Sequence, residues 1–331
     1  PQEGKHPWGR TTGGESSPLC SIDESYKYIF LPTCYSFTFV FSLSLNAVVL
    51  LRSFRRTKRW NASLIYMVNL ASTDFMYGLS LPFLVASYVM RDRWVFGDFM
   101  CRLVRFLFYF NLYCSIFFLT CISVHRYLGI CHPMRVIALE TKKAVKCTCV
   151  LVWAVVFALT CPIFRFARTA RAAGGVDNCW DDAIDRDFSD YVPYGVALHM
   201  EFAAGVSVFL GADSTYAGRR RKSIRTIVTI TLLFALCFFP FHVTRTVFLL
   251  LKVSKGVPCQ TMTTVSMCYK ITRPLASFNA WLNALLYFLT KDKGGCCPPP
   301  APATTGPLLP LRMLAKGDER TYCPPHLNTL I

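Results

Sequence analysis

Cationic side chains stand inside otherwise apolar stretches at several places in this chain. His242 and Arg245 follow Pro240 in the run FALCFFPFHVTRT, which covers residues 234–246. Placing such groups in apolar surroundings is costly unless they find a partner of opposite charge. Two explanations stay open at this point: charges that reach from a helix end to a membrane interface, or a binding site for an anion.

Two further sets repeat this pattern at helical spacing. Arg105, Tyr109 and Tyr113 recur every four residues, and Lys270 and Arg273 are three apart, so each set lies on one helix face. Arginines from separate helices at similar depth repel one another in a low dielectric unless an anion lies between them. Phosphate oxygens accept paired hydrogen bonds from guanidinium groups, and a nucleobase stacks on tyrosine. These residues favour a site for a nucleoside di- or triphosphate.

The elements that must position these residues are membrane helices. The chain has 331 residues, of which 53% are hydrophobic, and its net charge is +17. Because Lys and Arg flank apolar blocks instead of covering a polar surface, the charge does not indicate nucleic-acid binding. A helix needs about 20 apolar residues to cross the hydrocarbon core and must satisfy its own backbone there. Seven blocks meet this length: residues 28–51, 63–89, 101–128, 145–164, 192–212, 224–251 and 263–290.

The basic residues predict the orientation of these helices. The loops after the first, third and fifth blocks are rich in Lys and Arg, whereas the others are mixed or acidic. Basic loops stay in the cytoplasm, so we place the N-terminus outside and the C-terminus inside. We expect an all-α membrane protein with a seven-transmembrane helix bundle at 28–290, an extracellular segment at 1–27 and a cytoplasmic Pro-rich tail at 291–331.

Four cysteines fall on the predicted outer side, where disulfides persist: Cys20, Cys101, Cys179 and Cys259. Cys101 opens the third helix and Cys179 lies in the long loop after the fourth. A bridge between these two would hold that loop over the bundle, and Cys20 would then pair with Cys259. Four cysteines allow three pairings, so the connectivity stays open.

Short motifs carry a resemblance to a known family. They are NLASTD at 69–74, HRY at 125–127, FALCFFP at 234–240 and NALLY at 283–287. With these motifs the chain resembles the rhodopsin-like G-protein-coupled receptors over nearly all of residues 25–290. Three strings are similar to those of the nucleotide receptors, or purinoceptors: WVFGD at 94–98, FPFHVTRT at 239–246 and YKITRPLAS at 269–277. They are most similar to those of members that respond to UTP, ATP or UDP.

The resemblance implies a function and a ligand site. We expect a plasma-membrane receptor, not an enzyme, that binds an extracellular nucleotide and activates a heterotrimeric G protein, phospholipase C and calcium release. Its other partners would be membrane lipids. Asp181 resembles an acidic position in the family's lid loop. The predicted ligand set is Arg105, Tyr109, Tyr113, Asp181, His242, Arg245, Lys270 and Arg273.

The resemblance also implies a switch and an ion site. Arg126 and Tyr287 would act at the cytoplasmic end, and the bend at Pro240 would let the sixth helix swing outward. The only cofactor expected is a sodium ion in the middle of the bundle; a polar network without an ion is the alternative. Its ligands would be Asp74, Ser115, Asn279 and Asn283.

Features of the fifth and seventh blocks depart from the family pattern and leave other functions open. The fifth block, 192–212, lacks the usual proline and has little cytoplasmic extension, and Ala284 stands where the family keeps a proline. A nucleotide-binding decoy that has lost G-protein coupling is therefore one alternative. A receptor for an anionic lipid mediator is the other, because related seven-helix proteins use similar cationic pockets for carboxylates.

Overall fold

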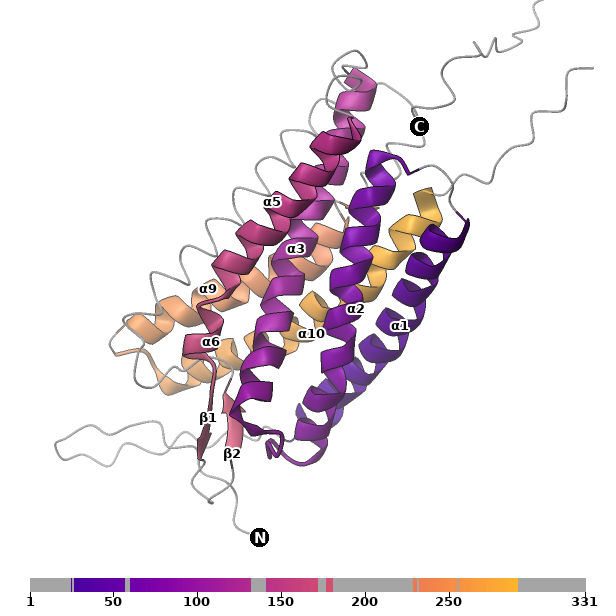
Figure 1. Ribbon diagram of the computed structural model, residues 1–331. Helices are drawn as coiled ribbons and strands as arrows, with labels where there is room; N and C mark the ends of the chain where they lie inside the picture. Colours follow the sequence, from indigo (N-terminus) through magenta and orange to yellow (C-terminus); the bar gives the residue numbers. More distant parts are fainter. Residues whose placement is uncertain are drawn as a thin grey trace, which may run out of the picture. The chain divides into compact units, whose positions relative to one another are not determined.

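The computed structural model describes residues 25, 27–56, 60–131, 141–171, 177–180, 229–230, 232–254 and 256–290. Within these residues the chain forms long helices and one short β-hairpin (Figure 1). The helices are α1 (Lys27–Arg56), α2 (Ala62–Val89), α3 (Gly97–Cys131), α5 (Lys142–Thr160), α6 (Ile163–Phe166), the π-helix η1 (Phe234–Phe238), α9 (Phe239–Val253) and α10 (Cys259–Thr290). The strands are β1 (Arg168–Arg171) and β2 (Asp177–Trp180), which pair antiparallel.

Six of the seven predicted membrane spans coincide with these helices. Four helical segments of the described chain are long and apolar enough to cross a membrane: Lys27–Arg55, Gly97–Leu128, Lys142–Phe166 and Ala235–Lys252. The predicted fifth span, 192–212, lies outside the described residues. The helical membrane fold is thus confirmed, while the orientation of the termini stays a prediction.

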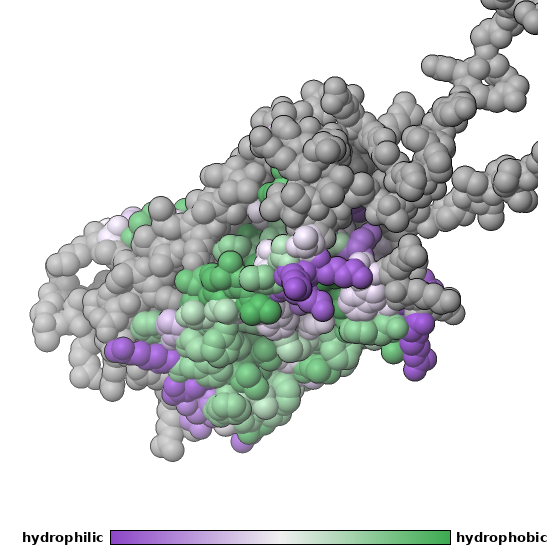
Figure 2. Space-filling model, turned by 45° about the horizontal axis from the view of Figure 1, so that its top comes forward, coloured by the Kyte–Doolittle hydropathy of each residue, from purple (hydrophilic) through white to green (hydrophobic). Residues whose placement is uncertain are grey.

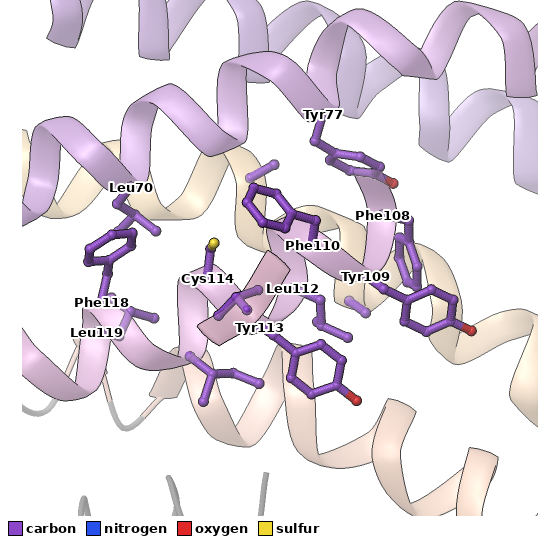
Figure 3. Close-up of a cluster of buried hydrophobic side chains, with 14 of the residues drawn as sticks. Leu70, Tyr77, Phe108, Tyr109, Phe110, Leu112, Tyr113, Cys114, Phe118 and Leu119 are labelled. Atoms are coloured by element: carbon purple, nitrogen blue, oxygen red, sulfur yellow. The ribbon is translucent and has the colours of Figure 1, made fainter. Parts of the chain in front are cut away.

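The helices pack around a core of large aromatic side chains. α1 lies against α2 and α10, α2 against α3, and α10 against η1 and α9 (Figure 1). α3 contributes much of the centre, because Tyr109, Tyr113 and Phe118 are each at most 1% exposed. Figure 3 shows these side chains leaving α3 on several sides. A helix that is apolar nearly all round belongs in the middle of a bundle, which is where α3 stands.

Local chemistry sets several helix ends. The side chain of Asn61 accepts a hydrogen bond from the Leu64 amide at 2.9 Å, and Thr141 caps α5 through the Ala144 amide at 3.3 Å. α5 ends at Thr160, and the predicted span 145–164 lies within the apolar helical segment Lys142–Phe166. Pro162 lacks the N–H that would continue the helix, and the chain resumes as the single turn of α6.

An irregular turn precedes Pro240, where the sequence predicts a bend. The five residues of η1 form a π-helix that leads directly into α9, and Pro240 occupies the first turn of α9. Proline removes one backbone donor and its ring crowds the carbonyl four residues earlier, so a regular α-turn is disfavoured. The wider π-turn relieves that crowding.

A disulfide joins the hairpin to the start of α3. Cys101 and Cys179 are bonded, with their Cα atoms 5.6 Å apart. Asp98 adds a second link, because its Oδ1 accepts from the backbone N–H of Thr169 at 2.9 Å and from the Thr169 hydroxyl at 3.1 Å. We call the end of the bundle that carries these links the disulfide end. The sequence analysis did not predict the hairpin.

The structure describes only one of the two cysteines of the other predicted bridge. Cys259 is disulfide-bonded, whereas its predicted partner Cys20 lies outside the described residues.

At the same end, Lys27 Nζ lies 2.5 Å from Asp92 Oδ2, and the Tyr28 hydroxyl donates to the same oxygen at 3.2 Å. These contacts tie the start of α1 to the turn between α2 and α3.

We predict that replacing both Cys101 and Cys179 by serine lowers the free energy of unfolding by about 2–4 kcal/mol, because the bridge no longer restricts the unfolded chain. Thermal unfolding of the detergent-solubilised protein measures the loss. Cys268→Ser is the control, since Cys268 is an exposed free thiol. Equal melting temperatures for the double variant and the control would contradict the prediction.

Candidate functional site

Three arginines from three different helices are buried toward the disulfide end. Arg105 on α3 is 4% exposed, Arg245 on α9 is 2% exposed and Arg273 on α10 is 6% exposed. None of the three side chains therefore reaches outward along the lipid-facing surface, as an interfacial charge would. The burial matches the geometry that the sequence spacing predicts for these positions.

Arg245 and Tyr109 join α9 to α3. Arg245 Nη1 donates a hydrogen bond to the Tyr109 hydroxyl, and the guanidinium carbon lies 4.5 Å from the Tyr109 ring centroid. One turn away on each helix, the rings of Tyr113 and His242 meet edge to face with centroids 6.0 Å apart. Figure 3 shows Tyr109 and Tyr113 on the same side of α3, as their spacing predicts. Cation–aromatic contacts of this kind stabilise a buried guanidinium.

Arg105 connects α3 to the hairpin. Its Nη2 donates to the backbone carbonyl of Cys179 at 3.1 Å. The disulfide partner of Cys101 therefore also contacts the buried cation one turn further along α3. Asp181, the predicted acidic residue of the lid loop, lies outside the described residues.

Arg273 lies over an aromatic ring of α3. Its guanidinium carbon is 5.3 Å from the Phe108 centroid, so Arg273 and Arg245 contact adjacent residues of the same helix. Lys270, three residues earlier on α10, is half-buried.

Direct links hold α9 and α10 in register beside these residues. The hydroxyls of Thr244 and Thr272 are 2.7 Å apart, and each residue is next in sequence to one of the buried arginines. The rings of Phe248 and Tyr269 stack with centroids 5.5 Å apart. The sequence analysis missed these contacts, because neither threonine nor tyrosine stands out in an apolar helix.

A second polar cluster lies in the middle of the bundle. Asp74 on α2 accepts hydrogen bonds from Asn111 at 2.6 Å and from Asn283 at 3.2 Å, and Asn283 also donates to Ser115 at 3.2 Å. Ser115 donates to Asn279 Oδ1 at 3.4 Å. The structure thus brings together all four residues that the sequence predicted for an ion site.

The sequence analysis missed Asn111, although its position one turn before Ser115 on the same face of α3 was a signal. Helix packing around Asp74 is close as well. The Ser42 hydroxyl donates to the Asp74 carbonyl at 3.0 Å, and a Cβ on Gly78 would come within 3.1 Å of that hydroxyl oxygen. Glycine therefore lets α1 approach α2 at the level of the cluster.

The predicted switch residues lie away from the arginines. Arg126 is half-buried near the far end of α3, and Tyr287 is 4% exposed near the end of α10. Pro240 lies between these residues and the arginines, at the junction of η1 and α9. α10 continues without interruption past Ala284, the position where the family keeps a proline.

Comparisons with known proteins agree with the fold and with the sequence motifs. Residues 45–287 match the family described as 7 transmembrane receptor (rhodopsin family). Among the P-two-Y purinoceptors, the chain is 41% identical to purinoceptor 2 of Homo sapiens over 308 residues, which cover 87% of this chain and 81% of that protein. It is 39% identical to purinoceptor 4 of Homo sapiens over 303 residues, covering 86% and 82%. It is 38% identical to purinoceptor 3 of Gallus gallus over 301 residues, covering 85% and 90%.

These matches identify a receptor of the plasma membrane that crosses it several times, and not an enzyme. They extend over the polar cluster, α9 and α10, so the buried arginines lie within the shared region. The chain belongs to the rhodopsin family of seven-transmembrane receptors and, within that family, to the purinoceptors.

Proposed function

We propose that this chain is a G-protein-coupled receptor for extracellular nucleotides of the UTP, ATP or UDP type. The observation that carries the proposal is the burial of Arg105, Arg245 and Arg273 on three different helices. Gathering three positive charges in a low dielectric favours the binding of an anion. The names of the relatives, all purinoceptors, point to the same ligand class.

Each part of a nucleotide has a matching group in this site. The phosphates would accept paired hydrogen bonds from the guanidinium groups, which suit phosphate oxygens better than a lysine does. The base would stack against Tyr109 or Tyr113, which share one face of α3. His242 and Lys270 would add donors at the margin. Asp181 would pair with an arginine while the site holds no ligand.

The same geometry provides a route for transduction. Arg245 and His242 lie on α9, directly after the irregular turn of η1 and Pro240. A ligand that contacts α9 together with α3 and α10 favours the arrangement in which these contacts are best, which is a population shift. The sixth predicted helix would then bend at the π-turn and swing outward, so that the far end with Arg126 and Tyr287 would open to a G protein. Activation of phospholipase C and calcium release would follow.

The proposal requires the disulfide end to face outward. The alternation of basic loops in the sequence supports this orientation. The Cys101–Cys179 bridge supports it too, because disulfides persist outside the cell and are rare inside it. Membership of the purinoceptors does not favour either alternative function, the decoy or the lipid-mediator receptor.

We further propose that the polar cluster holds a sodium ion. Oxygen atoms suit a hard cation, and the cluster supplies a carboxylate, a hydroxyl and amide oxygens. Asn283 Oδ1 is buried and accepts no hydrogen bond from the described residues, so an acceptor is left for a cation. Asp74, Ser115, Asn279 and Asn283 would be the ligands, and the ion would supply the positive charge that a buried carboxylate needs.

For the nucleotide site, we expect Arg245→Ala and Arg273→Ala each to reduce nucleotide potency by about 10- to 100-fold, because each removes a charged hydrogen-bond donor. The measurement is cytosolic calcium in cells without endogenous nucleotide receptors, after addition of UTP, ATP, UDP or ADP. Arg165→Ala is the matched control, since Arg165 is exposed on α6 and should leave potency unchanged. Surface expression is quantified for every variant.

Two outcomes would overturn this assignment. If both arginine variants responded as strongly as the wild type, the pocket would be elsewhere. If a wild-type receptor at the cell surface bound nucleotide and gave no response in any G-protein assay, the chain would be a decoy.

For the ion site, we expect sodium chloride to raise the melting temperature of the solubilised wild-type protein relative to choline chloride at equal concentration. Binding to the folded state alone stabilises it by about 1 kcal/mol at several times the dissociation constant. Asp74→Asn should abolish the difference, and Ser72→Ala should keep it, because the Ser72 hydroxyl bonds to the Val68 carbonyl of its own helix. A wild-type protein with the same melting temperature in both salts would leave the network without an ion.

A further inference from the structure

The carboxylate of Asp98 contacts two separate parts of the disulfide end. Its Oδ1 accepts hydrogen bonds from the backbone N–H of Thr169 at 2.9 Å and from the Thr169 hydroxyl at 3.1 Å. Its Oδ2 accepts from Arg102 Nε at 2.6 Å, and Arg102 Nη1 donates to the Phe164 carbonyl. One side chain at the start of α3 therefore fixes β1 directly and α6 through Arg102.

The turn before α3 places this carboxylate. Gly97 has a φ of 78°, a left-handed backbone conformation that glycine adopts without steric cost. The indole N–H of Trp94, which is 3% exposed, donates to the Gly97 carbonyl at 2.8 Å and fixes the turn. α3 begins at Gly97, so Asp98 stands in its first turn. The string WVFGD at 94–98 thus sets the position of one carboxylate.

The hairpin connects Asp98 to a buried cation. In the register of the two strands, Thr169 pairs with Cys179. Cys179 is bonded through sulfur to Cys101, and its carbonyl accepts from Arg105 Nη2 at 3.1 Å. Asp98 and Arg105 are thus attached to opposite strands at the same level of one hairpin. Figure 1 shows this hairpin beside the start of α3.

The attachment of β1 restricts how the hairpin can turn. β2 is held by the disulfide and by the Asp177 carbonyl, which accepts from the Trp94 N–H at 2.7 Å. Because both of these attachments lie on β2, they alone would let the hairpin swing about that strand as about a hinge. Asp98 holds β1, so such a swing would break its hydrogen bonds. The Cys179 carbonyl therefore stays on Arg105.

We propose that Asp98 is a positioning residue for the ligand site. By holding β1 it keeps the Cys179 carbonyl on Arg105 and so orients this arginine for an anion. The inference rests on the proposed nucleotide site for its ligand. An arginine that is already ordered loses less conformational freedom when it binds a phosphate. Asp98 is itself acidic and acts through the hairpin instead of touching the anion.

The ion pair with Arg102 does not by itself explain this arrangement. On the face of the bundle in Figure 2 hydrophobic residues predominate, whereas water reaches Arg102 and Asp98, whose side chains are 30% and 42% exposed. An exposed pair four residues apart on one helix contributes little to stability. The contacts with Thr169 and Phe164 are different, because they join α3 to residues 71 and 62 positions away in the chain.

Charge and positioning predict opposite effects when Asp98 is replaced by alanine. A carboxylate near the site repels an anionic ligand, so charge alone predicts that Asp98→Ala raises nucleotide affinity. Positioning predicts that the affinity falls by about 3- to 10-fold, which corresponds to the loss of one hydrogen bond. Titration of UTP against the melting temperature of the solubilised full chain measures the affinity without a G protein.

A double-mutant cycle tests whether Asp98 acts through Arg105. In an Arg105→Ala receptor, Asp98→Ala should not lower the affinity further, because the arginine to be positioned is gone. In an Arg245→Ala receptor the full decrease should persist, because Arg245 is held by Tyr109 of α3 and not by the hairpin. A merely structural loss would weaken UTP binding equally in both backgrounds.

Hydrogen–deuterium exchange tests the hairpin in the absence of any ligand. The Thr169 amide donates to Asp98, so peptides that cover β1 should exchange about 3- to 10-fold faster in Asp98→Ala, while those of α9 keep the wild-type rate. Arg165→Ala is the control, because it removes a charge beside Phe164 and leaves the contacts of Asp98 intact. It should keep the wild-type exchange and affinity.

Thr169→Val provides a second variant if Asp98→Ala does not fold, which the melting temperature without UTP decides beforehand. It removes the hydroxyl bond and keeps the backbone bond, so the affinity should fall by about twofold.

Three results would overturn the inference: an affinity of Asp98→Ala at or above that of the wild type, an equal decrease in the Arg105→Ala background, or unchanged exchange of β1. A wild type that binds no UTP would refute the proposed function and the ligand role of Asp98 with it. The exchange rates would then still decide whether Asp98 holds the hairpin.

Discussion

Burial of guanidinium groups is the constraint on which the disulfide end of this receptor depends. Arg245 is held by the ring and hydroxyl of Tyr109, Arg273 lies over Phe108, and Arg105 donates to the Cys179 carbonyl. Arg245 and Arg273 both contact α3 and Arg105 contacts the hairpin, so α3, α9, α10 and the hairpin converge on one region. Burying positive charge in an apolar bundle is costly, and the proposed binding of an anion would offset that cost.

One of these cations, Arg245, lies on the helix that follows the irregular turn. α9 begins at the π-turn before Pro240, where the regular hydrogen-bond pattern of a helix is already broken. The bundle also contains the Asp74 cluster, in which α2, α3 and α10 share hydrogen bonds. In the proposed transduction, a change at the arginines would reach the far end through this irregular helix and this polar network.

Sequence reasoning succeeded where a residue's type and spacing were sufficient. Long apolar blocks predicted the helices, and the spacing of Tyr109 and Tyr113 predicted that they share a face of α3. It failed where the deciding partner was remote. The hairpin depends on the hydrogen bond that Asp98 accepts from the Thr169 backbone N–H. The hydrogen bond between Thr244 and Thr272 depends on the register of α9 and α10. Asn111 shares a face of α3 with Ser115, but only the packing of α2 against α3 brings it to Asp74.

By itself the sequence determined the helical membrane architecture, the family and the set of cationic residues. Apolar length, basic loops and short motifs are local properties, and they survive without knowledge of packing. Only the tertiary structure decided which groups those cations contact and that the bridge joins Cys101 to Cys179. The reason is that contacts between residues distant in the chain arise from how helices pack, and no single helix records its neighbours.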